Sequence, residues 1–144
     1  MPVSERLIPL LVYEDIQAAH DFLVNAFGFA SGGVERSASG EVVHAEVRVG
    51  DAPIWLHRVT AEHKLDSALR VDMAGSGLVV YVPDVDAHHA RARAAGALID
   101  SAPTDQPYGQ REYGARDLEH HRWWFATLSA GGSDGETTAQ AGTA

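Results

Sequence analysis

The chain has 144 residues, of which 45% are hydrophobic and 22% charged, values typical of one compact domain or of two half-domains that share a core. It contains no cysteine, which excludes disulfides, thiolate metal sites and cysteine nucleophiles. The formal net charge is −9 with no basic run, so nucleic acid is not an expected partner, whereas a cationic small molecule would be attracted.

The first half of the chain begins without a recognisable targeting signal, since residues 1–6 have neither the basic segment nor the apolar core of a signal peptide. An apolar extended segment leads into a predicted helix over residues 15–27, with Asp15 as its N-cap and Gly28 as its C-cap. Three strands are then expected at about 29–36, 41–49 and 52–58. No stretch approaches the roughly 20 apolar residues of a membrane span, so we expect a cytoplasmic protein with no membrane partner.

The second half repeats this order after a polar connector at residues 59–76. Asp84 and Gly96 bound a predicted helix over residues 84–95. Strands are expected at about 98–103, 110–115 and 121–128. The last residues are small and polar and are predicted to be disordered. The expected organisation is a first module at 1–58, the connector at 59–76, a second module at 77–128 and the tail at 129–144.

The two halves also share landmarks at an offset of about seventy residues, which indicates an internal duplication. The repeated landmarks, first half before second, are Val12 and Val80, Tyr13 and Tyr81, Asp15 and Asp84, Glu46 and Glu112, and Asp51 and Asp117. Each half therefore has the pattern βαβββ, and the sequence predicts an α+β protein with two such modules.

Strand alternation assigns the side chains of the segments 41–49 and 52–58 to two faces. The apolar side chains expected under the helix are those of Val43, Ala45, Val47, Val49, Ile54 and Leu56. A hairpin turn at residues 50–51 would pair residue 44 with residue 57 and residue 46 with residue 55. The opposite face then carries His44, Glu46, Trp55 and His57.

The same alternation applies to the second module. Trp123 and Phe125 are expected on the helix side of the last strand, which places Arg122 and Trp124 on its other face. Gln110 and Glu112 join them if Glu112 matches Glu46. The faces turned away from the helices thus collect histidine, carboxylate, arginine and tryptophan side chains.

The histidines allow several interpretations. Three interpretations of His44 and His57 stay open: they are surface residues, they are members of a polar pocket, or they are a metal-binding pair. The adjacent histidines at 88–89 are interpreted as part of a solvated helix face. Adjacent helical positions point in different directions, so the two rings are not expected to share a ligand. The adjacent histidines at 120–121 are interpreted as part of a turn that leads into the last strand.

Several segments of the chain resemble the vicinal oxygen chelate superfamily. These segments are IPLLVYED at 8–15, AFGF at 26–29, YVPDVD at 81–86, YGQREY at 108–113 and DLEHHRWWF at 117–125. The resemblance covers roughly residues 6–128, nearly all of the expected folded region.

This resemblance implies that the two modules curl their sheets into a cup-shaped cleft, often within a homodimer that exchanges modules. Enzymes of the superfamily hold a divalent metal through His, Glu or Gln. The corresponding positions here are Ile8, Trp55, Gly77 or Leu78, and Trp124, and none of these side chains ligates a metal. The resemblance therefore implies the metal-free branch, without metal or cofactor, which includes bleomycin-resistance proteins that sequester a cationic drug. Relatives commonly have glycine where this chain has His120.

We therefore expect a small-molecule binding protein that sequesters a planar or cationic compound in an aromatic, acidic cleft. The expected ligand-binding residues are His44, Glu46, Trp55, His57, Glu112, Arg122 and Trp124. The alternative is a divalent-metal-dependent lyase, isomerase or dioxygenase that uses His44, His57 and either Glu46 or Glu112 as ligands. A third hypothesis is a metal-free enzyme with Glu46 or Glu112 as its base, or a regulatory subunit, so enzymatic activity stays an open question.

Overall fold

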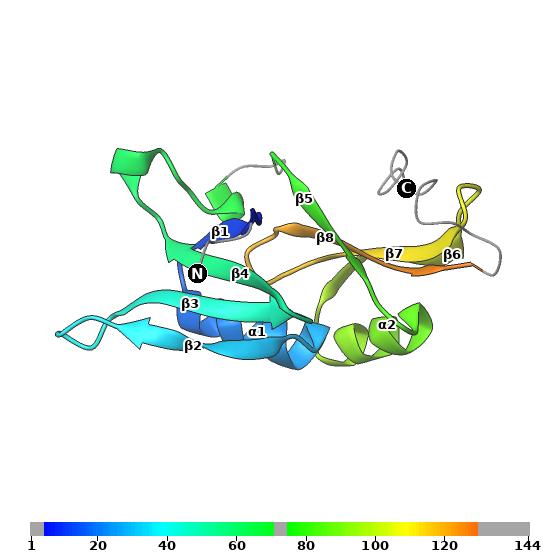
Figure 1. Cartoon of the computed structure of the whole chain (residues 1–144), viewed down its shortest axis with the longest axis horizontal. Helices are drawn as coiled ribbons and strands as arrows, with labels where there is room; N and C mark the ends of the chain where they lie inside the picture. Colours follow the sequence, from blue (N-terminus) through cyan, green and yellow to red (C-terminus); the bar gives the residue numbers. More distant parts are fainter. Residues whose placement is uncertain (1–4, 71–74, 130–144) are drawn as a thin grey trace.

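The computed structural model describes residues 5–70 and 75–129. Its elements in chain order are β1 (Leu10–Tyr13), α1 (Ile16–Phe27), β2 (Ala30–Arg36), β3 (Val42–Val49), β4 (Ala52–Arg58), η1 (Ala61–His63), η2 (Ala68–Arg70), β5 (Gly77–Tyr81), α2 (Val85–Ala94), β6 (Leu98–Asp105), β7 (Gln110–Arg116) and β8 (Arg122–Leu128) (Figure 1). The predicted helices and strands are confirmed to within two residues at each end. None of the helices in the described ranges has the length and apolar character that crossing a bilayer requires. The disorder predicted for 129–144 concerns residues that, apart from Ser129, lie outside those ranges.

The strands form two four-stranded mixed sheets with the same topology. Their strand orders are β1-β4-β3-β2 and β5-β8-β7-β6, and in each sheet the first strand runs parallel to its neighbour while the other pairs are antiparallel. Figure 1 shows one module at each end of the molecule. The α+β class and the duplicated βαβββ architecture are therefore confirmed. The two sheets are separate and are not joined edge to edge.

The helix-facing sides of both sheets share one hydrophobic core. Asp15 accepts a hydrogen bond from the backbone N–H of Ala18 and begins α1, and Gly28 ends the helix in a left-handed conformation (φ 76°). The last residue of α1, Phe27, packs edge-on against Trp123 and Phe125 of β8, at centroid distances of 5.6 and 4.8 Å. Aromatic residues of one module thus bury those of the other.

Burial and strand register confirm the predicted faces except at Val43. Its neighbour Val42 packs against the core instead, at an irregularity in the β2–β3 register. Ala45, Val47, Ile54, Leu56, Trp123 and Phe125 are all buried in the core. In the β3–β4 hairpin, His44 pairs with His57 and Glu46 pairs with Trp55. The polar side chains of this hairpin therefore lie on the sheet face opposite α1.

The register corrects one part of the predicted duplication. Trp55 pairs with Leu10 on one side and Glu46 on the other, whereas the equivalent Trp124 pairs with Val79 and Gly114. The position that matches Glu46 is thus occupied by a glycine. The prediction that Glu112 matches Glu46 is wrong. The turn between β7 and β8 is longer than the turn between β3 and β4, so equal sequence spacing does not give equivalent positions in the two hairpins. Glu112 instead occupies the position equivalent to His44.

The modules are connected by buried carboxylates in the turn between β7 and β8. Asp117 accepts a hydrogen bond from the Tyr13 hydroxyl at 2.5 Å. Glu119 accepts one from the backbone N–H of Glu14 at 2.7 Å, and the hydroxyl of Ser67 donates to the same carboxylate at 2.6 Å. This turn therefore anchors both the first module and the connector.

The interpretation of the 88–89 pair as a solvated helix face is wrong for His88. Its Nε2 lies 2.8 Å from the carbonyl oxygen of Phe27, and its Nδ1 lies 2.6 Å from the hydroxyl of Tyr113. A neutral ring satisfies both contacts when Nε2–H donates and Nδ1 accepts. Burial lowers the pKa of His88 below its ordinary value. The imidazole therefore bridges the two modules in its neutral form.

We expect His88→Gln to flatten the pH dependence of stability below pH 6.5. The unfolded chain binds a proton at His88 more readily than the folded protein, so this residue makes the free energy of unfolding fall as the pH drops from 6.5 towards the lowered folded value. Urea denaturation between pH 5 and 8 measures the slope, and the exposed His63→Gln serves as control. An unchanged slope in His88→Gln would contradict the assignment.

Candidate functional site

The first sheet presents a polar and aromatic group on the face opposite α1. The Glu46 carboxylate accepts hydrogen bonds from the Trp55 indole at 3.0 Å and from the Arg48 guanidinium at 2.8 Å. These two bonds, with Arg48 contributing most, lower the pKa of Glu46. His44 lies edge-on to the Trp55 ring at 5.6 Å. Glu46 therefore orients an exposed indole and is ionised while doing so.

His44 and His57 form a cross-strand pair on this same face. Partial burial, followed by the charge of His44, lowers the pKa of His57. The His57 ring also stacks on His63 at 6.4 Å. Within the described ranges, no group of three or more histidine, aspartate or glutamate side chains is arranged to hold a metal. Of the two carboxylates expected to complete such a set, Glu46 is bonded to Arg48 and Trp55, and Glu112 belongs to β7 in the other sheet.

The second sheet carries Trp124 laid across two glycine positions. A Cβ atom on Gly77 of β5 would lie 2.4 Å from Trp124 Cζ3, and one on Gly114 of β7 would lie 3.3 Å from Trp124 Nε1. The indole therefore extends over both neighbouring strands, and the absence of side chains beneath it allows this orientation. The Arg122 guanidinium lies 5.2 Å from the ring centroid and 3.2 Å from the Asp100 carboxylate.

Further along β7 lies a buried polar cluster that sequence reasoning recognised only in part. Glu112 is 2% exposed and accepts a hydrogen bond from the Tyr108 hydroxyl. Gln110 is fully buried, and its Oε1 accepts a bond from the Tyr81 hydroxyl at 2.8 Å. Tyr81 and Tyr108 were missed as site residues. Alternation along β5 would have found Tyr81, because its neighbour Val80 belongs to the core.

The structure brings the predicted residues together as two groups rather than one. His44, Glu46, Trp55 and His57 lie on the first sheet, and Glu112, Arg122 and Trp124 lie on the second. Three cavities lined entirely by described residues have volumes of about 240, 480 and 580 Å³, and none of the seven predicted residues lines them.

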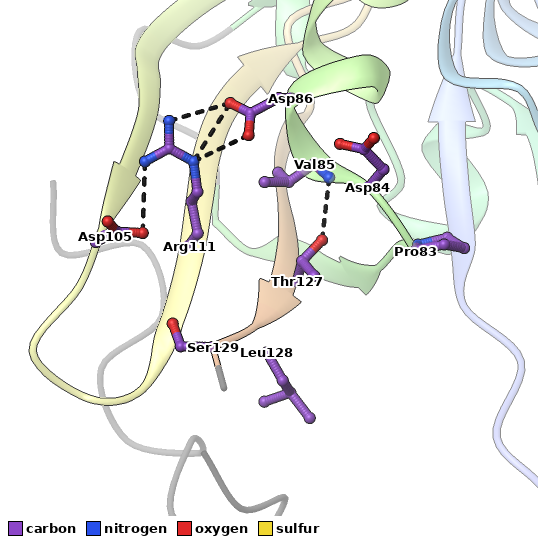
Figure 2. Close-up of a pocket in the computed structure, with 9 residues that line it drawn as sticks. All are labelled: Pro83, Asp84, Val85, Asp86, Asp105, Arg111, Thr127, Leu128 and Ser129. Carbon is purple, nitrogen blue, oxygen red and sulfur yellow. Dashed lines mark hydrogen bonds and ion pairs between the residues drawn. The ribbon is translucent and has the colours of Figure 1, made fainter. Parts of the chain in front are cut away.

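One of these cavities lies at the N-terminal end of α2 and has a volume of about 480 Å³. Figure 2 shows Arg111 between Asp86 and Asp105, with ion-pair distances of 3.0 and 3.4 Å. The backbone N–H of Val85 donates to the Thr127 hydroxyl at 3.0 Å. Arg111 is paired with both Asp86 and Asp105, whereas the Asp84 carboxylate accepts a hydrogen bond from the backbone N–H of Ala87 at the start of α2. The lining therefore carries more acidic than basic side chains.

We expect Gly77→Ala to move the Trp124 indole and to lower the free energy of unfolding by about 1–3 kcal/mol, because the added methyl group overlaps the ring. Near-ultraviolet circular dichroism reports the change in the indole environment, and urea denaturation reports the stability. Gly75→Ala is the control, because a Cβ atom there meets nothing within 4 Å. Identical spectra for the two variants would show that the orientation of the Trp124 indole does not depend on the missing side chain at Gly77.

Duplicated βαβββ modules with separate four-stranded sheets define a two-module protein of the glyoxalase-like fold class. The chain belongs to the Glyoxalase/Bleomycin resistance protein/Dioxygenase superfamily, whose family model matches residues 7–125. The family expected from the sequence is therefore confirmed.

Several individual proteins are similar over most of the chain. The uncharacterized protein Rv0887c of Mycobacterium tuberculosis is 30% identical over 124 residues, which cover 84% of this chain and 73% of that protein. The crystal structure of TioX from Micromonospora sp. ML1 has a TM-score of 0.68 at 33% identity, and covers 87% of this chain and 97% of its own. TnmS3, an antibiotic binding protein from Streptomyces sp. CB03234, has a TM-score of 0.63 at 22% identity, with coverages of 90% and 99%.

Proposed function

We propose that this protein binds a planar small molecule by stacking it on Trp124, and that it sequesters the compound rather than converting it. The observation that carries the proposal is the orientation of the Trp124 indole across Gly77 and Gly114. A ring held in this way presents a flat aromatic surface at little cost in side-chain entropy on binding. The Arg122 guanidinium lies over this ring, 5.2 Å from its centroid, and adds a charged group to the surface.

The comparisons support ligand binding as the general activity. The superfamily includes bleomycin-resistance proteins, and TnmS3 is described as an antibiotic binding protein. The likeness to TnmS3 concerns the fold, so the ligand of this chain has to be argued from its own residues. An antibiotic-like planar compound fits the aromatic surface that Trp124 presents.

We also propose that a second copy of the chain completes the cleft. The sheet faces turned away from the helices expose Leu10, Trp55, Val79 and Tyr81, by 37–50% each. Apolar groups on an open sheet face favour association. A homodimer that places the first-sheet group of one copy opposite the second-sheet group of the other would bring all seven predicted residues to one cleft. Sedimentation equilibrium tests this, and a monomer at micromolar concentration contradicts it.

We expect Trp124→Ala to weaken the binding of planar tricyclic compounds by about tenfold or more, because it removes the stacking surface. Isothermal titration calorimetry with 9-fluorenone measures the effect. Trp124→Phe keeps an aromatic ring and should lose much less affinity. Leu118→Ala, an exposed position in the β7–β8 turn, is the control and should bind like the parent.

Unfolding temperatures for all three variants establish that the fold is intact. If folded Trp124→Ala bound 9-fluorenone as tightly as the parent, the ligand would lie elsewhere and the proposal would fail. Binding of no planar compound by the parent protein would also contradict it.

A further inference from the structure

We infer that the ligand of the Trp124 surface is a neutral planar compound with a carbonyl oxygen, and that this oxygen accepts a hydrogen bond from Nε2 of Gln110. This inference rests on the proposed function and specifies the chemical class of its ligand. Three observations carry it: an amide donor without a partner, its position on the sheet face, and the charges around it.

The first observation is the unsatisfied amide of Gln110. The side chain is fully buried, and its Oε1 accepts the Tyr81 hydroxyl, yet Nε2 has no hydrogen-bond partner among the described residues. A buried donor left unpaired costs free energy, and native proteins leave few such groups without a reason. An acceptor atom supplied by a ligand gives this donor a partner.

The second observation is that Gln110 and Trp124 share one face of the second sheet. Tyr113 and Ala115 of β7 belong to the hydrophobic core, so Gln110 and Gly114, whose positions alternate with theirs, lie on the opposite face. Gly114 is the residue that pairs with Trp124. The donor and the stacking surface therefore lie along neighbouring strands on the same side.

Tyr81 connects these two features to solvent. It pairs with Ala126 of β8, and its hydroxyl reaches Gln110 on the next strand, so the tyrosine side chain extends over the small alanine. The residue is 50% exposed, whereas Gln110 is not exposed at all. For a ligand on Trp124 to reach the Gln110 amide, the Tyr81 ring has to move aside.

The third observation concerns the charged side chains next to Gln110 and next to Trp124. Glu112 lies two residues from Gln110 on the same face of β7, and its carboxylate disfavours an anionic ligand. Arg122 lies against the Trp124 ring, where a cationic ligand would otherwise stack. A neutral acceptor is compatible with both neighbours. The negative charge of the whole chain therefore does not make this surface a cation site.

A matched pair of probes tests the inference: 9-fluorenone and fluorene share one planar ring system and differ at the carbonyl. We expect the parent protein to bind fluorenone at least fivefold more tightly than fluorene. Gln110→Met removes the donor and should bring the two affinities together by weakening fluorenone. Tyr81→Phe removes the hydroxyl bond to the same amide but keeps the donor, and should preserve the ratio. The cation 9-aminoacridine should bind more weakly than fluorenone.

The outcomes separate this inference from the proposed function. If both probes bind and Trp124→Ala weakens both, yet their affinities are equal in the parent or the ratio persists in Gln110→Met, the carbonyl inference is wrong and the stacking proposal stands. If neither probe binds the parent, the stacking proposal itself fails. Infrared spectroscopy of fluorenone bound to the parent protein gives a readout that needs no variant. A carbonyl stretch at the frequency found in an apolar solvent would overturn the inference.

Discussion

Replacing Asp117 with alanine is expected to lower the free energy of unfolding by about 3–5 kcal/mol. The buried carboxylate accepts hydrogen bonds from the Tyr13 hydroxyl at 2.5 Å and the Trp123 indole at 3.1 Å. It also accepts bonds from the backbone N–H groups of Glu119 at 3.0 Å and His121 at 3.1 Å. Alanine leaves these donors without their acceptor in a site that water does not reach. Because Tyr13 belongs to the first module, the loss also weakens the contact between modules.

Urea denaturation measures this loss, and two further variants define its origin. Asp117→Asn keeps the shape of the side chain and should cost less than Asp117→Ala. Asp51→Ala alters the exposed aspartate of the β3–β4 turn and should cost less than about 1 kcal/mol. A loss below about 1 kcal/mol for Asp117→Ala would show that the turn is not an anchor.

The second large effect is expected for Phe27→Ala, with a loss of about 3–5 kcal/mol in the free energy of unfolding. Phe27 is 2% exposed and ends α1 in contact with Trp123 and Phe125 of the other module. Its removal opens a cavity in the core shared by both sheets. We expect one cooperative unfolding transition in the parent protein, and a broader transition in the variant as the modules lose their common packing.

Phe22→Ala is the matched control, because Phe22 lies on the same helix, touches Phe27 edge-on at 5.2 Å and is only partly buried. Its loss should be clearly smaller. Equal losses for Phe22→Ala and Phe27→Ala, measured by calorimetry, would contradict the view that Phe27 joins the modules.

The sheet faces could be predicted from the sequence because strand alternation has a fixed period. Alternation predicts Trp55 and Trp124 on the faces away from the helices, and a two-residue turn predicts the register that pairs His44 with His57, as the structure has it. The expected turn role of His120 is likewise confirmed, since its φ of 68° lies in the left-handed region that favours glycine. That conformation fits the glycine that the family resemblance implies at this position.

Features that depend on contacts between elements could not be predicted in this way. His88 sits on a helix of weak amphipathic character, and its bridging role depends on how α2 packs against the end of α1. The burial of Gln110 and Glu112 depends on Tyr81 and Tyr108, which come from another strand and from a loop. Local periodicity contains no information about such distant partners.

The most direct test of the central claim follows the indole N–H resonances of the three tryptophans in a two-dimensional ¹⁵N correlation spectrum during titration with 9-fluorenone. Single Trp→Phe variants assign the signals. The Trp124 resonance is expected to shift with saturation, and the fully buried Trp123 should stay in place. A compound that binds while the Trp124 signal remains unchanged would contradict the assignment of this ring as the ligand-binding surface.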